Sequence, residues 1–145
     1  MVLTLFITTL LVGVSVIIHY EAVYRLITFM PSRSRRPRLG IIWGILLALL
    51  AHILEVLIFA VGYYGLILAE KYGTLVGEVT PGFQDCIYYS FVTYTTLGFG
   101  DLIPTGPLRF LTGIESLTGL VLIAWTASCL YFQMEALYRK HSRSG

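Results

Sequence analysis

The sequence predicts an all-α membrane protein with three transmembrane helices and a short fourth helix that enters the bilayer and turns back. Of its 145 residues, 57% are hydrophobic and only 12% are charged, and the mean hydropathy is +0.80. A soluble domain of this length carries about twice that share of charged residues. Three apolar segments, about residues 2–29, 40–69 and 107–138, exceed the roughly 20 residues that cross a bilayer.

The first segment, residues 1–30, predicts a retained membrane helix and not a cleaved signal peptide. No positively charged region precedes its apolar core, and no cleavage pattern of small residues follows Ile18. This helix is expected to span the plasma membrane or the bacterial inner membrane.

Two basic clusters predict how the chain is oriented. The first lies in the linker 31–39, where Pro31 and Pro37 are expected to keep either neighbouring helix from continuing. The second lies in the tail, residues 139–145. Because two spans separate the clusters, both can face the cytoplasm, with the N-terminus outside and the C-terminus inside. The arginines of the linker either only set this orientation or also contact anionic lipid headgroups, and they are Arg33, Arg35, Arg36 and Arg38.

A short helix is predicted between the second and third spans. The stretch DCIYYSFVTYTT, residues 85–96, is apolar and of helical length but too short to cross the membrane. Thr80 and Pro81 predict its N-cap and first turn. Such a helix must turn back, and non-helical backbone at membrane depth is tolerated only when it is buried in protein or lines a water-filled path.

The segment TTLGFGD, residues 95–101, follows this helix and predicts a cation path. Its alternating glycines allow backbone angles closed to other residues, so that successive carbonyl groups can point to one side. A ring of such carbonyls above a threonine hydroxyl can replace the hydration shell of a monovalent cation. The preceding helix would direct its negative C-terminal end toward that path. Because one chain supplies one wall, several chains are expected to surround an axis.

TTLGFGD resembles the selectivity-filter signature of the potassium-channel pore module, a family of tetrameric pore-loop cation channels. The resemblance extends from Phe83 to about Tyr138 and includes Asp85 and Pro104. It implies a homotetramer around a K⁺ path, with residues 40–138 as the pore module and the helix 1–30 as an addition to it. The implied parts are an outer helix at 40–70, a turret at 71–82, a pore helix at 83–96, a filter at 96–101 and an inner helix at 107–138.

By position, the resemblance assigns the ion-binding carbonyls to five filter residues, with the Thr96 hydroxyl at the innermost site. These residues are Thr96, Leu97, Gly98, Phe99 and Gly100. The residues that would support the filter from beside or behind it are Thr95, Asp101, Tyr88, Tyr89 and Glu115. The filter carbonyls alone would hold K⁺, and no cofactor is expected.

Three positions depart from the commoner family pattern. Leu97 replaces Val or Ile and adds bulk behind the filter, and Phe99 replaces Tyr, so a phenolic hydrogen bond to the pore helix is lost. Val92 lies where some members have a carboxylate that partners the filter aspartate. We therefore expect Asp101 to find another donor, the hydroxyl of Tyr88.

The third span contains candidate residues for a hinge, a cavity and a gate. Gly119 is either a hinge for opening or a site of close helix packing. Phe132 could form a hydrophobic constriction that closes by dewetting. Some of these side chains could instead face lipid or a neighbouring helix. Helical spacing places four positions toward the axis, Val121, Ala124 or Trp125, Ser128 and Phe132.

Ionisable residues within the spans need partners, since an unpaired intramembrane charge costs roughly 2.5–3.5 kcal/mol or more. Glu115 is expected to brace the pore helix, with gating or pH sensing as the alternative. His52 and Glu55 share a helix face and form either a satisfied polar pair facing the first helix or a proton sensor. His19 and Glu21 either form a matching set on the first helix or mark its approach to the cytoplasmic interface.

The function predicted from these features is a potassium-selective channel that conducts K⁺ passively. The alternatives are a weakly selective cation channel, a non-conducting scaffold or accessory subunit with the same fold, and a proton-coupled carrier that uses His52, Glu55 and Glu115. No nucleophile with its base, metal-spaced cluster or phosphate loop predicts an enzyme, and no nucleic-acid partner is expected. Cys86 and Cys129 are expected to be inert buried thiols.

Overall fold

Three long helices form the body of the protein in the computed structural model, which describes residues 2–29, 37–77 and 82–142. The long helices are α1 (Val2–Phe29), α2 (Pro37–Leu68) and α4 (Leu108–Ser142). Each contains a stretch long and apolar enough to cross a membrane, with mean hydropathies of 2.3, 2.5 and 1.5 in chain order. The prediction of an all-α fold with three membrane helices is confirmed.

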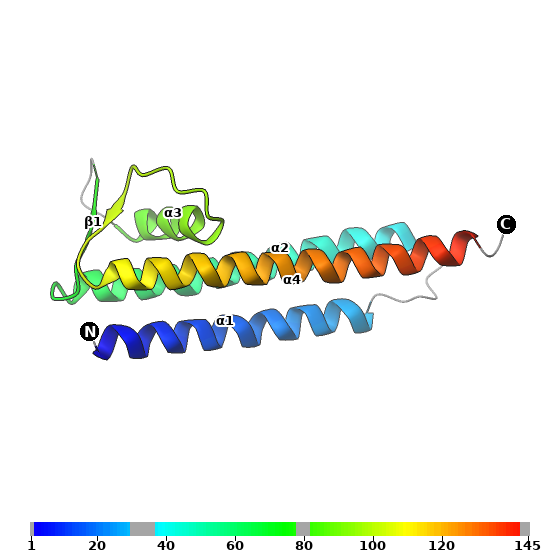
Figure 1. The fold of residues 1–145 in the computed structure, drawn as a ribbon, viewed down its shortest axis with the longest axis horizontal. Coiled ribbons are helices and arrows are strands. Elements are labelled where there is room, and N and C mark those ends of the chain that lie inside the picture. The colour runs from blue at the N-terminus through cyan, green and yellow to red at the C-terminus, as the bar shows by residue number, and fades with distance from the viewer. Residues whose placement is uncertain (1, 30–36, 78–81, 143–145) are drawn as a thin grey trace.

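The long helices run side by side, and α1 packs against both α2 and α4 (Figure 1). The short helix α3 (Phe83–Tyr94) lies on the opposite side of the α2–α4 pair from α1. The start of α1 is at the same end of the bundle as α3, and the end of α4 is at the opposite end. The two ends of the described chain therefore lie at opposite ends of the bundle.

The helix α3 has 12 residues, which is about 18 Å and too short to cross the roughly 30 Å hydrocarbon core. It begins after the N-cap residue Gly82, whose N–H donates to Asp85 Oδ2 at 2.7 Å. Thr80 and Pro81, which we expected to start this helix, lie outside the described residues. The helix ends at Tyr94, two residues earlier than expected.

Two short strands, which the sequence did not predict, pair with each other. One lies before α3 and the other after the loop 95–101. The strand β1 (Leu75–Val76) pairs in antiparallel fashion with β2 (Ile103–Pro104). Next to this ladder, Thr105 N–H donates to the carbonyl oxygen of Thr74 at 2.9 Å, and Thr74 N–H donates to Thr105 Oγ1 at 2.9 Å. The chain before α3 and the chain after residues 95–101 are thus fastened together.

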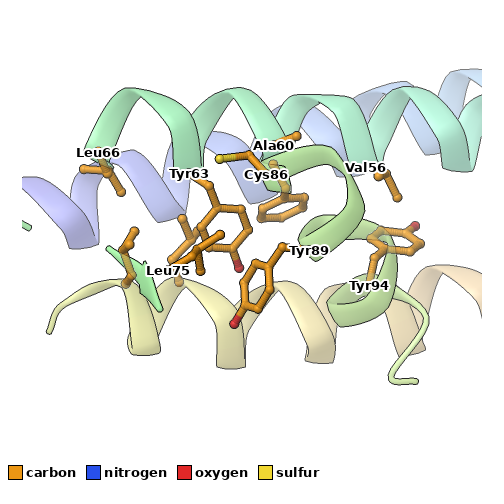
Figure 2. Close-up of a cluster of buried hydrophobic side chains, with 11 residues drawn as sticks. Val56, Ala60, Tyr63, Leu66, Leu75, Cys86, Tyr89 and Tyr94 are labelled. Atoms are coloured by element: carbon orange, nitrogen blue, oxygen red, sulfur yellow. The ribbon is translucent and has the colours of Figure 1, made fainter. Parts of the chain in front are cut away.

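A cluster of buried apolar side chains joins α2, α3, β1 and α4 (Figure 2). Tyr63 of α2 is fully buried, and its ring meets the ring of Tyr89 edge-on with centroids 5.1 Å apart. Cys86 lies in the same cluster, while Cys129 is half-buried, and both are free thiols. The cluster fixes α3 against α2 and α4.

The helices α2 and α4 each extend beyond one of their expected bounds. The helix α2 begins at Pro37, because proline, which lacks an N–H and has a fixed φ, is well tolerated in the first helical position. The helix α4 continues to Ser142, so most of the tail expected at 139–145 is helical.

Candidate functional site

The loop 95–101 begins at a backbone cap at the end of α3. The N–H of Thr96 donates to the carbonyl oxygen of Thr93 at 3.0 Å, and the N–H of Leu97 donates to that of Val92 at 2.9 Å. Thr96 has φ of 59°, the left-handed conformation that often follows the end of a helix. This cap ends the helix and turns the chain into the loop.

Backbone handedness alternates along the loop. Thr96, Gly98 and Gly100 have φ of 59°, 60° and 80°, whereas Leu97 and Phe99 between them are not left-handed. No hydrogen bond within the described chain is accepted by the carbonyl oxygens of residues 96–100. The loop therefore presents a run of carbonyl groups that remain available to a ligand.

The side chains of the loop have little cover within one chain. Leu97 is 59% exposed and Phe99 is 65% exposed, which is unusual for large apolar residues beside a well-packed helix. The Thr95 hydroxyl is held by the carbonyl oxygen of Phe91 at 2.7 Å. The surface around the loop thus lacks the packing that would bury Leu97 and Phe99.

Asp101 at the end of the loop accepts a hydrogen bond from Tyr88. The distance between Tyr88 Oη and Asp101 Oδ2 is 2.6 Å, and Tyr88 is the donor that we expected from the sequence. This hydrogen bond lowers the pKa of Asp101 and raises the pKa of the Tyr88 hydroxyl. Val92 is buried and takes no part in the pair.

Behind α3, Glu115 links three helices. Its carboxylate is fully buried and accepts hydrogen bonds from the hydroxyls of Tyr63, at 2.6 Å, and Ser90. Ser90 belongs to α3 and Tyr63 to α2, so one side chain of α4 holds both. The Tyr89 hydroxyl lies 3.0 Å from Thr112 Oγ1 in the same region.

The helix α4 leaves one face without cover. Val121 is 55% exposed and Phe132 is 66% exposed, and the other exposed residues at this helical spacing include Ala124 and Ser128. Trp125, the alternative to Ala124, does not lie on this face. Its ring lies 5.3 Å from that of His19 of α1, so Ala124 is the member of the expected alternative that lies on the exposed face.

Gly119 lies at the point where α4 approaches the end of α3. A Cβ atom at Gly119 would collide with the main-chain carbonyl group of Tyr94. The helix α4 is continuous through this residue. Close helix packing, one of the two roles expected for Gly119, is therefore present in this conformation.

A polar cluster lies between all four helices, and the sequence predicted only part of it. Glu55 is fully buried and is flanked by His19 Nδ1 at 3.0 Å and His52 Nδ1 at 3.1 Å. The Tyr94 hydroxyl donates to the second carboxylate oxygen. Thr126 Oγ1 lies 3.2 Å from Nε2 of both histidines. His52 and Glu55 thus do share a face that meets the first helix.

The expectations for the first helix need correction. His19 is 1% exposed and binds α2, so it does not mark an interface with water. Glu21 is exposed and pairs with Arg25 of its own helix at 2.9 Å, and it takes no part in the cluster. The buried stripe of α1 includes small or polar residues that recur at helical spacing, and this pattern is visible in the sequence. These residues are Thr4, Thr8, Ser15 and His19.

Of the four linker arginines, Arg33, Arg35 and Arg36 lie outside the described residues. Arg38 lies in the first turn of α2. Their expected contact with lipid stays a prediction.

Comparison with known proteins identifies similarity to ion channels. The family model described as "Ion channel" matches residues 51–134. The inward rectifier potassium channel Kirbac3.1 of Paramagnetospirillum magnetotacticum is 39% identical over 61 residues, which is 41% of this chain and 21% of the relative. The two-pore potassium channel 4 of Arabidopsis thaliana is 34% identical over 82 residues, 56% of this chain and 28% of the relative. The chain thus spans less than a third of either relative, and no solved structure gives a significant match.

Proposed function

This chain belongs to the potassium-channel pore-module family of ion channels, and we propose that four copies form a potassium-selective channel. Each copy would contribute the carbonyl groups of residues 96–100 to a filter on the common axis. The described chain is a membrane protein of an ion-channel family and not an enzyme. Potassium would move passively, with no cofactor besides the transported ion.

The alternating backbone handedness is the observation that carries this proposal. Where every residue of an extended segment has negative φ, successive carbonyl groups point to opposite sides. Left-handed φ at Thr96, Gly98 and Gly100 turns every second peptide, which lets the carbonyls line one side. Carbonyl oxygens in such a row can replace the hydration shell of a desolvated cation.

The exposed surfaces of one chain support assembly around an axis. Leu97, Phe99 and the face of α4 that carries Val121 and Phe132 are large apolar surfaces. Neighbouring copies would cover Leu97 and Phe99, while Val121, Ala124, Ser128 and Phe132 would line the cavity below the filter. The carbonyl groups at the end of α3 would add a partial negative charge that favours a cation there.

The supporting residues would hold the filter in this shape. Asp101 is tied to Tyr88 at the outer end, and Thr95 is tied to the last turn of α3. Glu115 fixes α3 against α2 and α4 through Ser90 and Tyr63. In this proposal the N-terminus lies outside, and the four linker arginines lie in the cytoplasm near anionic headgroups.

Ion flux into liposomes tests the proposal. The purified protein is expected to pass K⁺ much faster than Na⁺. Gly98→Ala should abolish the flux, because a side chain is strained at φ of 60° although the site itself is open. Gly13→Ala, at an exposed position of α1 with no atom near the added Cβ, is the matched control and should conduct normally.

Two outcomes would contradict parts of the proposal. Equal K⁺ and Na⁺ flux would favour the weakly selective cation channel. Absence of flux from protein that reconstitutes as a tetramer would favour a non-conducting scaffold or accessory subunit.

A further inference from the structure

We propose that His19, His52 and Glu55 form a binding site for one divalent transition-metal ion of the zinc class. One ligand atom from each residue lies within 4.8 Å of the others. Two imidazole nitrogens and one carboxylate oxygen form a donor set that suits zinc and its neighbours, whereas Mg²⁺ and Ca²⁺ require oxygen ligands. This site is separate from the filter and does not depend on whether the pore conducts K⁺.

The distances in the cluster are close to those between neighbouring ligands of one metal ion. His19 Nδ1 lies 3.0 Å from Glu55 Oε1, and His52 Nδ1 lies 3.1 Å from Glu55 Oε2. Ligands held tetrahedrally at 2.0–2.1 Å from zinc lie about 3.3 Å apart. The two nitrogen–oxygen distances therefore differ from this value by only a few tenths of an ångström, and the remaining pair of ligand atoms, which lies within 4.8 Å, would have to close toward it to admit the ion.

In the arrangement in which both Nδ1 atoms donate to Glu55, the cluster lacks one hydrogen that an additional positive charge would supply. If both neutral histidines donate from Nδ1 to the Glu55 carboxylate, both Nε2 atoms carry lone pairs. Both then face the hydroxyl of Thr126, at 3.2 Å, which has only one hydrogen to donate. One Nε2 would therefore face an oxygen lone pair in a buried place, which is costly.

A metal ion removes this conflict. With the ion bound to both Nδ1 atoms, each Nε2 carries a hydrogen, and the two lone pairs of Thr126 Oγ1 accept both. A second ring nitrogen that donates to an oxygen is also what orients metal-bound histidines in other proteins. The Tyr94 hydroxyl, 3.0 Å from His52 Nδ1, lies beside the position of a fourth ligand.

One additional proton would satisfy the same count, but the arrangement favours a metal. One histidine is enough to share a proton with the Glu55 carboxylate. Here a second histidine from a different helix faces the other oxygen of the same carboxylate. The His52 side chain is 16% exposed, so the cluster contacts the exterior of the chain at His52.

The site would join the additional helix to the pore module. His19 comes from α1, and both of the other ligands come from α2. Through Tyr94 and Thr126, the ligands also contact the end of α3 and the middle of α4. An ion bound here would fasten α1 to all parts of the module.

Metal binding to the full-length protein in detergent, freed of any affinity tag and stripped with chelator, tests the proposal. The wild-type protein is expected to bind one Zn²⁺ per chain, and Co²⁺ is expected to give the visible absorption bands of a four-coordinate ion. Mg²⁺ should not compete. The Co²⁺ spectrum needs no variant and so does not depend on whether a variant folds.

Variants locate the ion. His19→Ala and Glu55→Gln should lose stoichiometric binding, and Thr126→Val should weaken it by roughly 10–100-fold. His141→Ala, which removes the third histidine of the chain, is the matched control and should bind as the wild type does.

Three results would overturn the site. They are absence of Zn²⁺ and Co²⁺ binding by the wild type, binding by His19→Ala equal to the wild type, and loss of binding in His141→Ala alone. If neither ion binds but the melting temperature of the wild type depends on pH near neutrality and that of His19→Ala does not, the cluster holds a proton and the metal assignment is wrong.

Discussion

Gly119 of α4 lies directly against the main-chain carbonyl group of Tyr94, the last residue of α3. The contact is between backbone atoms, so a rotamer change cannot relieve a clash there. It places α4 against the residue that precedes the loop 95–101. Gly119 is therefore the most constrained glycine of the described part of α4.

Gly119→Ala should destabilise the protein by about 1–3 kcal/mol, the usual cost of inserting a methyl group into a packed site. A lower melting temperature of the detergent-solubilised protein would show this loss. Gly13→Ala has open space around its added Cβ and should not lower the melting temperature. Equal melting temperatures of both variants and the wild type would show that α4 and α3 can separate at no cost.

Glu115→Ala should remove the link between α2, α3 and α4. The hydroxyls of Tyr63 and Ser90 would lose their bonds to the carboxylate, about 0.5–1.5 kcal/mol for each hydrogen bond, and would keep only Thr112 Oγ1 at 3.3 Å and the Val56 carbonyl oxygen at 2.8 Å. Thermal unfolding should detect the loss, and K⁺ flux should fall as α3 loosens.

Glu135→Ala provides the control for that experiment. Glu135 is a carboxylate of the same helix that pairs with Arg139 at 2.6 Å near the surface, where an ion pair contributes about 1 kcal/mol or less. A loss from Glu135→Ala as large as that from Glu115→Ala would mean that burial of Glu115 has no special role.

Tyr88→Phe should free Asp101 from its hydrogen bond. Because the bond lowers the pKa of Asp101 below its ordinary value, its contribution to stability is complete above that value and lost as the pH falls through the lowered pKa. The variant lacks this contribution, so it should be less stable than the wild type at neutral pH, and the difference should shrink as the pH falls through the lowered pKa. In recordings at neutral pH, its current should decline faster during sustained opening.

Tyr24→Phe, at an exposed position of α1, is the control for the loss of a hydroxyl. A Tyr88→Phe channel with unchanged conduction, time course and acid sensitivity would exclude a supporting role for the Tyr88–Asp101 pair.

Phe132→Ala should raise the flux of the resting channel if the Phe132 side chains close the pore by excluding water. The side chain is 66% exposed in one chain, on the same face as Ser128, so its removal should have little effect on the fold. Flux into liposomes measures the effect. Leu10→Ala, which truncates an exposed apolar side chain of α1, should leave the flux unchanged.

The sequence predicted the elements that depend on local composition. Apolar length alone identified the three spans, and the start and end of α1 were placed where the structure has them. The boundary of α3 was less accurate, because the sequence does not reveal that Thr96, a non-glycine residue, adopts left-handed φ and ends the helix. The β1–β2 pair was missed because two-residue strands have no periodicity to detect.

Contacts between distant parts of the chain were predictable only where chemistry restricted the choice. Asp101 needed a hydrogen-bond donor, and Tyr88, one helical turn before Val92 in α3, could supply one. The partners of Glu55 were found only in part. Tyr94 and Thr126 meet it or its histidines through the packing of four helices, which no spacing in the sequence encodes.

The packing of α1 has a mechanical consequence for any movement of α4. Trp125 and Thr126 of α4 lie against His19, in the part of α4 that follows Gly119. If that part swings outward, α1 must travel with it or give up these contacts. The moving body is then a pair of helices, and the lipid that it displaces is correspondingly greater than for a single helix.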